Sequence, residues 1–213
     1  MEELSQTGTR DRILKAAEVL LGERGFAGTR LHEIAERVGI QKASLFHYFA
    51  SKQDLYRAVL EESYGETDRL IRGALEVGGP PFEGIRILAE AWVDIVSAHP
   101  ARTKIFLRQA LGDEPVGPLT ENAQQLIRIV VDYIEVYQAK GEFEPVDAEA
   151  VVLEFIGNVA FFFTSAPVVA PASFANPTSP ACVARIKRHM VDTLHRCLVG
   201  NGAPVARAAR TAG

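Results

Sequence analysis

The chain has 213 residues, of which 47% are hydrophobic and 23% are charged, so it can bury a sizeable core and is too apolar to be intrinsically disordered. Its net charge of −4 argues at first against a nucleic-acid partner. Residues 1–60 are nearly neutral, however, with nine Lys and Arg against eight Asp and Glu, and affinity for phosphate depends on where the cations sit.

The first sixty residues carry the pattern of short helices around a small core. A first helix is expected over residues 10–24, followed by Phe26, which is expected to plug the core. A second helix follows because its apolar residues recur at i, i+3, i+4 and i+7. These residues are Leu31, Ile34, Ala35 and Val38. We expect Thr29 to cap the N-terminus of this helix, and Gly39 to end it in a left-handed conformation.

Residues 41–49, QKASLFHYF, are expected to form a third helix. Leu45 and Phe49 are four residues apart and should point inward together. The residues left facing out are mostly hydrogen-bonding and aromatic ones: Gln41, Lys42, Ser44, His47 and Tyr48. Ser51 should open a fourth helix with Asp54 as its capping-box partner. This is the layout of a helix-turn-helix, whose second helix fits a DNA major groove. An ordinary helical hairpin explains the pattern alone equally well.

The remaining sequence indicates further helices. The fourth helix is expected over residues 52–77, long enough to link the N-terminal unit to the rest of the chain, and others over residues 82–98, 101–111 and 119–139. Residues 147–166 are apolar on nearly every side, which indicates a helix buried on every side. We interpret this as one face in the core and another against a second subunit. A central core helix in a monomer is the less favoured alternative.

A long loop with four prolines is expected over residues 165–180, a length often associated with function, followed by an amphipathic last helix over residues 180–199. The sequence therefore predicts an all-α protein of about nine helices. Residues 1–55 form the DNA-binding unit in this prediction, residues 56–200 form a larger helical domain, and residues 201–213 form a disordered tail.

Several function classes find no support in the sequence. No Cys/His cluster has zinc spacing, and no nucleophile elbow or phosphate-binding loop is present, so we expect no metal, no cofactor and no enzymatic activity. The N-terminal MEELSQTG is acidic and polar, unlike a signal peptide, and prolines interrupt the most apolar stretch. The expectation is a soluble cytoplasmic protein with no membrane partner.

Spaced residues across segment 9–60 match the pattern of one known family. They are Ile13, Leu14, Ala16, Ala17, Gly25, Phe26, Thr29, Ile34, Ala35, Val38 and Gly39, then residues 44–49, Ser51, Lys52 and Leu55. Through them the segment resembles the N-terminal domain of the TetR/AcrR family of repressors. Two positions depart from the family pattern: Ala43 stands where Gly is common, and Phe46 where Tyr is common. Phe46 lacks the hydroxyl expected to bind a phosphate, although its ring can still pack against sugar.

The resemblance implies a set of DNA-contacting residues. It comprises Thr29, Arg30, His32, Gln41, Lys42, Ala43, Ser44, Phe46, His47, Tyr48 and Lys52. Gln41 and Ser44 suit base edges, whereas Lys42 and Lys52 suit phosphates at the two ends of the third helix. Six of them have a plainer interpretation: Thr29 as a helix cap, the two lysines and His32 as ordinary surface residues, and His47 and Tyr48 as partly buried ones.

The family also carries an inducer pocket among its fifth to eighth helices. The candidate lining residues here are Trp92, His99, Phe106, Arg108, Tyr133, Tyr137, Asn158 and Phe162, although aromatic residues at such positions are most often only core. The resulting hypothesis is a repressor released from a palindromic operator in double-stranded DNA by a small apolar or aromatic effector. It would be a homodimer joined through residues 147–166 and 180–199. The alternative is a helical small-molecule-binding or interaction protein without specific operator binding.

Overall fold

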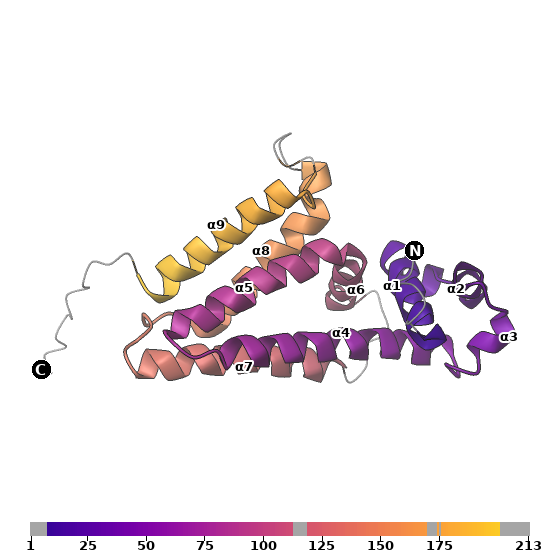
Figure 1. Ribbon diagram of the computed structural model, residues 1–213, viewed down its shortest axis with the longest axis horizontal. Coiled ribbons are helices and arrows are strands. Elements are labelled where there is room, and N and C mark those ends of the chain that lie inside the picture. Colours follow the sequence, from indigo (N-terminus) through magenta and orange to yellow (C-terminus); the bar gives the residue numbers. More distant parts are fainter. Residues whose placement is uncertain (1–7, 113–118, 170–173, 175, 201–213) are drawn as a thin grey trace, which may run out of the picture.

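The computed structural model describes residues 8–112, 119–169, 174 and 176–200. Within these residues it has nine α-helices, which confirms the all-α fold expected from the sequence. The helices are α1 (Thr9–Gly28), α2 (Leu31–Val38), α3 (Lys42–Leu45), α4 (Lys52–Leu75), α5 (Pro81–Ala98), α6 (Pro100–Ala110), α7 (Leu119–Ala139), α8 (Ala148–Val169) and α9 (Pro180–Leu198). Figure 1 shows α1–α3 as a small unit at one end of an elongated molecule and α5–α9 as a larger bundle.

The N-terminal core is built from the apolar residues that the sequence pattern places inward. Ile13 of α1, Ile34 of α2 and Leu45 of α3 are fully buried, and Phe49 and Leu55 lie beside them. The same core continues through Tyr56, Val59 and Leu60 of α4 and includes Ile105 of α6. The small unit therefore shares two helices with the larger domain.

The helix ends in this unit confirm two expected caps and correct a third. Gly39 ends α2 with φ 76°, and Ser51 caps α4 by accepting from the Asp54 N–H at 3.0 Å. Thr29 does not cap α2, contrary to expectation. Its hydroxyl donates to the carbonyls of Leu20 and Gly25 at 3.1 and 2.8 Å, so it closes the end of α1. That helix extends to Gly28, beyond the expected residue 24, through a kink at Gly25.

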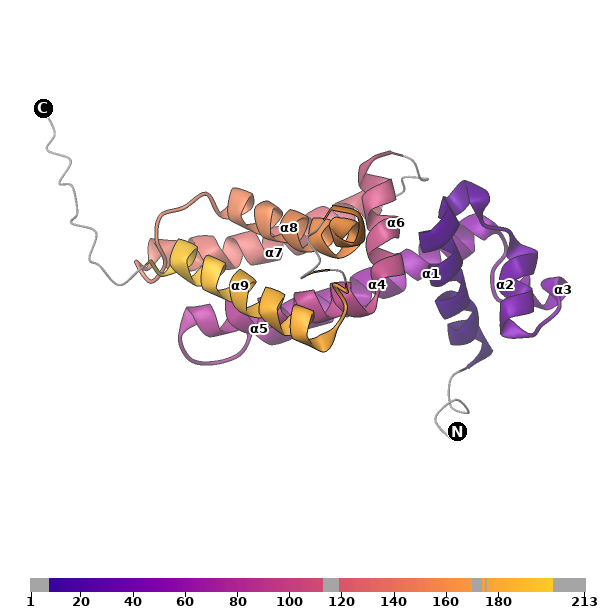
Figure 2. The ribbon, with the colours of Figure 1, turned by 90° about the horizontal axis from the view of Figure 1, so that it is seen from above.

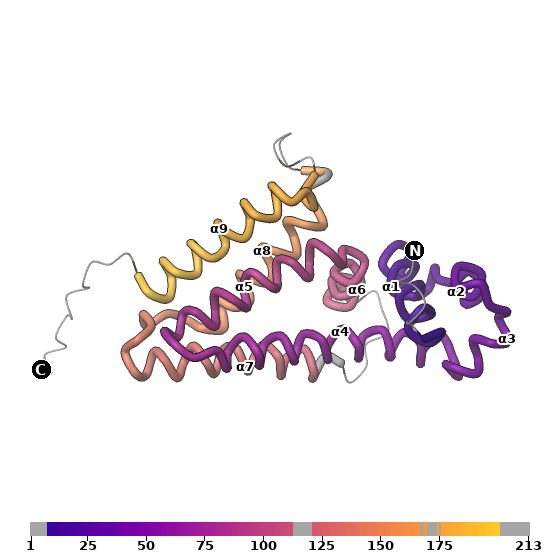
Figure 3. Tube along the Cα trace, in the orientation of Figure 1, coloured from indigo at the N-terminus to yellow at the C-terminus, as the bar shows by residue number. Residues whose placement is uncertain are grey.

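The 24-residue α4 connects the two parts of the molecule, as expected. Its first turns lie in the N-terminal core, whereas Ile71 and Ala74 lie in the second core with Ile85, Val131 and Ile134. The tube in Figure 3 follows α4 from the small unit to the far end of the bundle. Figure 2 shows α6 standing between α1 and the rest of the bundle.

The helix α8 is apolar around most of its circumference, but the residues that the structure describes cover only one side of it. Val159 and Phe163 pack into a third core with Val93 and Ile186, whereas Leu153 is 55% exposed and Phe161 62% exposed. Residues 165–169, expected in a loop, continue α8 instead, because Ala166 is still buried. Among the described residues, Ala148–Ala166 is also the one segment with the length and apolar composition of a membrane span.

Candidate DNA-binding surface and ligand cavity

The segment expected to read DNA is a shorter helix than the sequence suggests. The helix α3 ends at Leu45 rather than at residue 49. Phe46, His47 and Tyr48 follow in a tighter turn, in which each N–H donates to the carbonyl three residues earlier, at 3.0–3.2 Å. The chain turns here because Phe49 must enter the N-terminal core, where it is buried. The expected inward positions of Leu45 and Phe49 are both confirmed.

Most of the candidate DNA-contacting side chains are exposed, and they belong to α2, to α3 and to the residues that adjoin these two helices. Phe46 is 46% exposed and Tyr48 44% exposed, which is unusual for aromatic side chains and leaves both rings accessible. The other exposed members are Arg30, His32, Gln41, Lys42, Ala43 and His47, with Ser44 half-buried among them. Figure 1 shows α2 and α3 at the end of the molecule farthest from the larger domain, where a DNA duplex can approach.

Two candidate residues are placed differently. Thr29 is only 1% exposed and its hydroxyl donates to two carbonyls, so this hydroxyl would have to leave these partners to contact a phosphate. Lys52 is half-buried: its Nζ lies 4.4 Å from the centre of the Phe26 ring and donates to the Ala27 carbonyl at 3.4 Å. It must leave these contacts, at least in part, to reach a phosphate.

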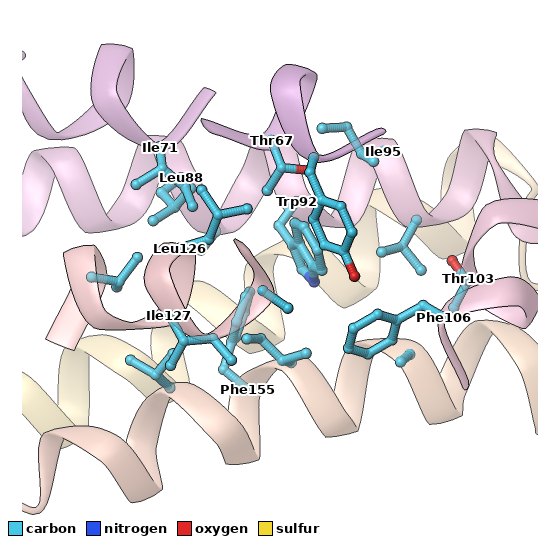
Figure 4. A pocket seen from close by; sticks show the side chains of 18 of the residues that line it. Thr67, Ile71, Leu88, Trp92, Ile95, Thr103, Phe106, Leu126, Ile127 and Phe155 are labelled. Atoms are coloured by element: carbon cyan, nitrogen blue, oxygen red, sulfur yellow. The ribbon is translucent and has the colours of Figure 1, made fainter. Parts of the chain in front are cut away.

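A cavity of about 160 Å³ lies inside the larger domain and is bounded by α4–α9. Figure 4 shows apolar side chains around most of it, among them Ile71, Leu88, Leu126 and Phe155. Its mostly apolar lining, with a few polar groups, is typical of a small-molecule site, and its volume, below the roughly 300–1,000 Å³ usual for drug-sized ligands, suits a small ligand. Trp92, His99 and Phe106, three of the residues expected to bind a ligand, line this cavity.

The other five candidates for ligand contact do not line the cavity. The Tyr133 hydroxyl donates to the Pro81 carbonyl at 2.9 Å, and its ring packs on Tyr137. Phe162 packs edge-on against Phe163 and Phe174. Asn158 is exposed on α8, and Arg108 is half-buried on α6 outside the lining. Neighbouring positions on one helix point in different directions, so Phe155 and Ala160 reach the cavity while Asn158 and Phe162 do not.

Several polar lining residues were not foreseen from the sequence. They are Ser63, Tyr64 and Thr67 on α4, and Arg102, Thr103 and Gln109 on α6. The sequence did contain a pattern that could have identified the residues on α4. Four of its residues recur at helical spacing and all line the cavity: Leu60, Tyr64, Thr67 and Ile71. Burial raises the pKa of the Tyr64 hydroxyl, which therefore stays protonated and able to donate at neutral pH.

Arg102 is the charged centre of the cavity wall. Its Nη1 donates to Glu66 of α4 at 2.6 Å, and its Nε and Nη2 donate to Glu18 of α1 at 3.2 and 2.9 Å. Burial would lower the pKa of Arg102, but the hydrogen bonds to Glu66 and Glu18 outweigh it and raise the pKa. The guanidinium is therefore a fixed positive charge that joins three helices.

The helix α6 also packs closely on α1. A Cβ placed on Gly22 of α1 would lie 2.6 Å from both the Cα and the carbonyl oxygen of Ala101, so only glycine permits this approach. Ile105, one turn further along α6, is buried in the N-terminal core. Leu60 of α4 belongs to that core and also lines the cavity. The cavity wall and the core of the DNA-binding unit thus share two helices, α4 and α6.

In the part of the chain that the structure describes, no group of three or more His, Cys, Asp or Glu residues is placed to hold a metal ion. Both cysteines, Cys182 and Cys197, are free thiols on α9.

Comparison with known proteins identifies the N-terminal unit. Residues 13–59 match the family model described as bacterial regulatory proteins, tetR family. The HTH-type transcriptional regulator RutR of Escherichia coli strain K12 is 27% identical over 173 residues, covering 76% of this chain and 81% of that protein.

Solved structures show the same fold over nearly the whole chain. The ketosteroid transcriptional regulator KstR2 of Mycobacterium tuberculosis matches with a TM-score of 0.71 at 21% identity, covering 91% of this chain and 96% of that one. AibR in complex with isovaleryl coenzyme A and operator DNA matches with a TM-score of 0.70 at 18% identity, covering 87% and 97%. The helix-turn-helix match and the all-helical fold agree: the chain carries, in residues 13–59, the helix-turn-helix domain of the tetR family of bacterial regulatory proteins, and its described helices have the fold of solved transcriptional regulators such as KstR2.

Proposed function

We propose that this regulator is a repressor that leaves its operator when a small, mostly apolar molecule enters the cavity of the larger domain. The observation that carries the proposal is the sharing of helices between the cavity and the N-terminal unit. Leu60 of α4 and Arg102 of α6 line the cavity, and both also hold the DNA-binding unit, Leu60 through its core and Arg102 through Glu18. A ligand that moves either helix therefore changes where the reading surface lies.

Thermodynamic linkage between ligand binding and DNA binding determines which conformation such a ligand must prefer. A ligand that prefers a conformation unsuited to DNA lowers DNA affinity, and DNA lowers ligand affinity by the same factor. The effect cannot exceed the difference between the ligand's affinities for the two conformations. The AibR structure, with isovaleryl coenzyme A and operator DNA in one complex, supports a ligand-responsive regulator of this fold.

The proposed DNA-bound form is a homodimer joined through α8 and α9. The exposed apolar side chains Leu153 and Phe161 on α8 would otherwise remain in water. Two helices from each subunit would form a four-helix interface with two-fold symmetry, which is the commonest arrangement of a dimer. The same contact accounts for the apolar composition of α8 without a membrane, in keeping with a protein that works in the cytoplasm.

Two-fold symmetry implies a palindromic operator. The two copies of α3 should enter successive major grooves about 34–36 Å apart on one face of the duplex. Gln41 and Ser44 are the proposed base-reading residues. Arg30, His32, Lys42, Ala43, His47, Tyr48 and, once released from Phe26, Lys52 are the proposed contacts to the DNA backbone, with the Phe46 ring against sugar.

Selection of bound duplexes from a random pool tests the proposal directly. The expected result is a palindrome whose half-site centres are separated by one helical turn. Titration of the selected duplex with apolar and aromatic compounds should then yield molecules that weaken binding and alter Trp92 emission. A set of tightly bound compounds that leaves operator affinity unchanged would contradict the effector model and favour a constitutive regulator.

A further inference from the structure

We infer that the cavity takes an uncharged apolar molecule with a carbonyl oxygen that accepts a hydrogen bond from the indole N–H of Trp92. The inference rests on the proposed function in treating this cavity as the effector site. It adds the chemical class of the effector and the residue that recognises it.

The main observation is a buried donor without an acceptor. Within the described residues, the Nε1 atom of Trp92 is buried and has no hydrogen-bond partner. An indole nitrogen can only donate, so nothing but an acceptor satisfies it. A buried polar group left without a partner destabilises the protein, and such groups are rare in native structures. Figure 4 shows the indole nitrogen on the edge of the Trp92 ring that lies, in this view, between Phe106 and Phe155.

Two of the neighbouring hydroxyl donors, those of Thr67 and Thr103, are already engaged with their own helices. The Thr67 hydroxyl donates to the Ser63 carbonyl at 2.9 Å, and the Thr103 hydroxyl lies 3.5 Å from the His99 carbonyl. Apolar residues make up most of the remaining wall. A ligand that fits this wall is itself apolar, and one acceptor in line with Trp92 suits it better than several polar groups do.

The charges at the cavity favour an uncharged ligand. Arg102 is the one Lys, Arg, Asp or Glu among the described residues of the lining, and its guanidinium already binds the carboxylates of Glu18 and Glu66. His99, whose Nδ1 lies 3.6 Å from Glu18, adds no charge when its ring is neutral, so one positive charge against two negative charges then leaves a net charge of −1 at this corner. A ligand carboxylate would have to displace one of these partners and lose its own hydration in an apolar cavity, which is costly. A ketone or ester carbonyl avoids both costs.

The test uses the fact that Trp92 is the only tryptophan, so ¹⁵N-labelled protein has a single indole N–H resonance. Three probes of nearly equal shape are compared: 2-acetylnaphthalene with a carbonyl acceptor, 2-ethylnaphthalene without one, and 2-naphthoate with a charge. A flexible ketone, 2-decanone, is added as a second shape. We expect both ketones to shift the indole proton resonance downfield. We expect 2-acetylnaphthalene to bind about tenfold more tightly than 2-ethylnaphthalene, the effect of one buried hydrogen bond.

Two variants separate the hydrogen bond from cavity shape. Trp92→Phe removes the N–H and keeps an aromatic ring, so the ketone should lose its tenfold advantage over the ethyl analogue. Phe106→Leu changes another lining residue without a polar atom, and should weaken both neutral probes by a similar factor. Equal binding of 2-acetylnaphthalene and 2-ethylnaphthalene to the natural protein would overturn the inference. So would tightest binding of 2-naphthoate, or no response of the indole resonance to either ketone.

The outcome is separable from that of the proposed function because these titrations contain no DNA. A ketone that binds through Trp92 but leaves operator affinity unchanged would refute effector control and uphold the chemistry of the site. A carboxylate that binds tightest and releases the operator would uphold effector control and overturn the inference.

Discussion

The guanidinium of Arg102 lines the ligand cavity and at the same time holds the carboxylate of Glu18 in the DNA-binding unit, with Nη2 and Oε2 2.9 Å apart. Both side chains are mostly buried, at 15% and 16% exposure. The pair therefore lies where a change in the cavity reaches α1 through a single contact. It is reinforced by the close approach of Gly22 to Ala101 a turn away.

Replacement of Glu18 by Gln should weaken this connection. Removing one partner of a buried ion pair costs about 3–5 kcal/mol, but Glu66 still binds Arg102, so we expect a loss of about 1–2 kcal/mol in the free energy of unfolding. We also expect the factor by which an effector lowers operator affinity to fall. Urea unfolding and operator titrations with and without effector measure the two effects. The matched control is Glu66→Gln, which leaves Arg102 bound to Glu18; an equal loss of effector response in both variants would contradict a special role for Glu18.

The DNA-binding surface offers a second test through Lys42. This residue is exposed on α3 with its Nζ 6.0 Å from the centre of the Phe46 ring, and it lacks the close contacts that hold Lys52. Lys42→Ala should weaken binding to all duplexes alike and reduce the slope of log affinity against log salt by about one. Gln41→Ala should instead change which bases are preferred, because removing a good hydrogen bond to a base edge costs about 1–3 kcal/mol of discrimination.

The control for Lys42 is Lys140→Ala, at the end of α7, where the ammonium group similarly lies 4.3 Å from the centre of an aromatic ring, that of Tyr137. It should leave the salt dependence unchanged. A change in base preference on Lys42→Ala, with none on Gln41→Ala, would reverse the roles that we assign.

The sequence was sufficient to predict the N-terminal unit because its signals are local. The spacing of Ile34, Ala35 and Val38 sets one face of α2 whatever lies around it, and Gly39 ends that helix as expected. Thr29 was misplaced because the same hydroxyl can serve a helix beginning or a helix ending, and only the packing of α1 selects the carbonyls of Leu20 and Gly25.

The ligand cavity was only partly predictable, for a different reason. Which side chain of a buried helix meets a void depends on how six helices pack, and the sequence does not encode this locally. Trp92 and Phe106 were found because they are large, whereas Tyr137 and Phe162 were included for the same reason and pack elsewhere. Arg102 was missed because its partners Glu18 and Glu66 are distant in sequence, at separations of 84 and 36 residues.

The proposed dimer can be tested on the exposed face of α8. Phe161 is 62% exposed in the monomer, so Phe161→Glu should leave the monomer folded. In the dimer it would place a charge from each subunit in an apolar interface, and we expect the dissociation constant to rise by at least about 100-fold, or about 2.8 kcal/mol. Sedimentation velocity at micromolar concentration measures this. Val136→Glu, on an exposed position of α7, is the control and should remain dimeric; a monomeric natural protein would end the hypothesis.

A pH measurement tests the environment of Tyr133 at the junction of α5 and α7. Burial raises the pKa of this hydroxyl from 10 to about 12, with a smaller contribution from Tyr137 beside it, and the hydroxyl donates to the Pro81 carbonyl at 2.9 Å. Because the folded pKa lies above the unfolded one, the contribution of Tyr133 to stability is fully present below pH 10 and is lost as the pH rises towards 12. The urea midpoint of the natural protein should therefore fall more steeply between pH 9.5 and 11.5 than the midpoint of Tyr133→Phe. At pH 8 the Tyr133→Phe variant should be less stable than the natural protein.

The control is Tyr48→Phe, which removes an exposed hydroxyl and should leave the steep fall in place. Parallel curves for the natural protein and Tyr133→Phe across this range would show that the Tyr133 hydroxyl titrates alike in the folded and unfolded chains, and that its bond to Pro81 contributes nothing to the closure of this end of the bundle.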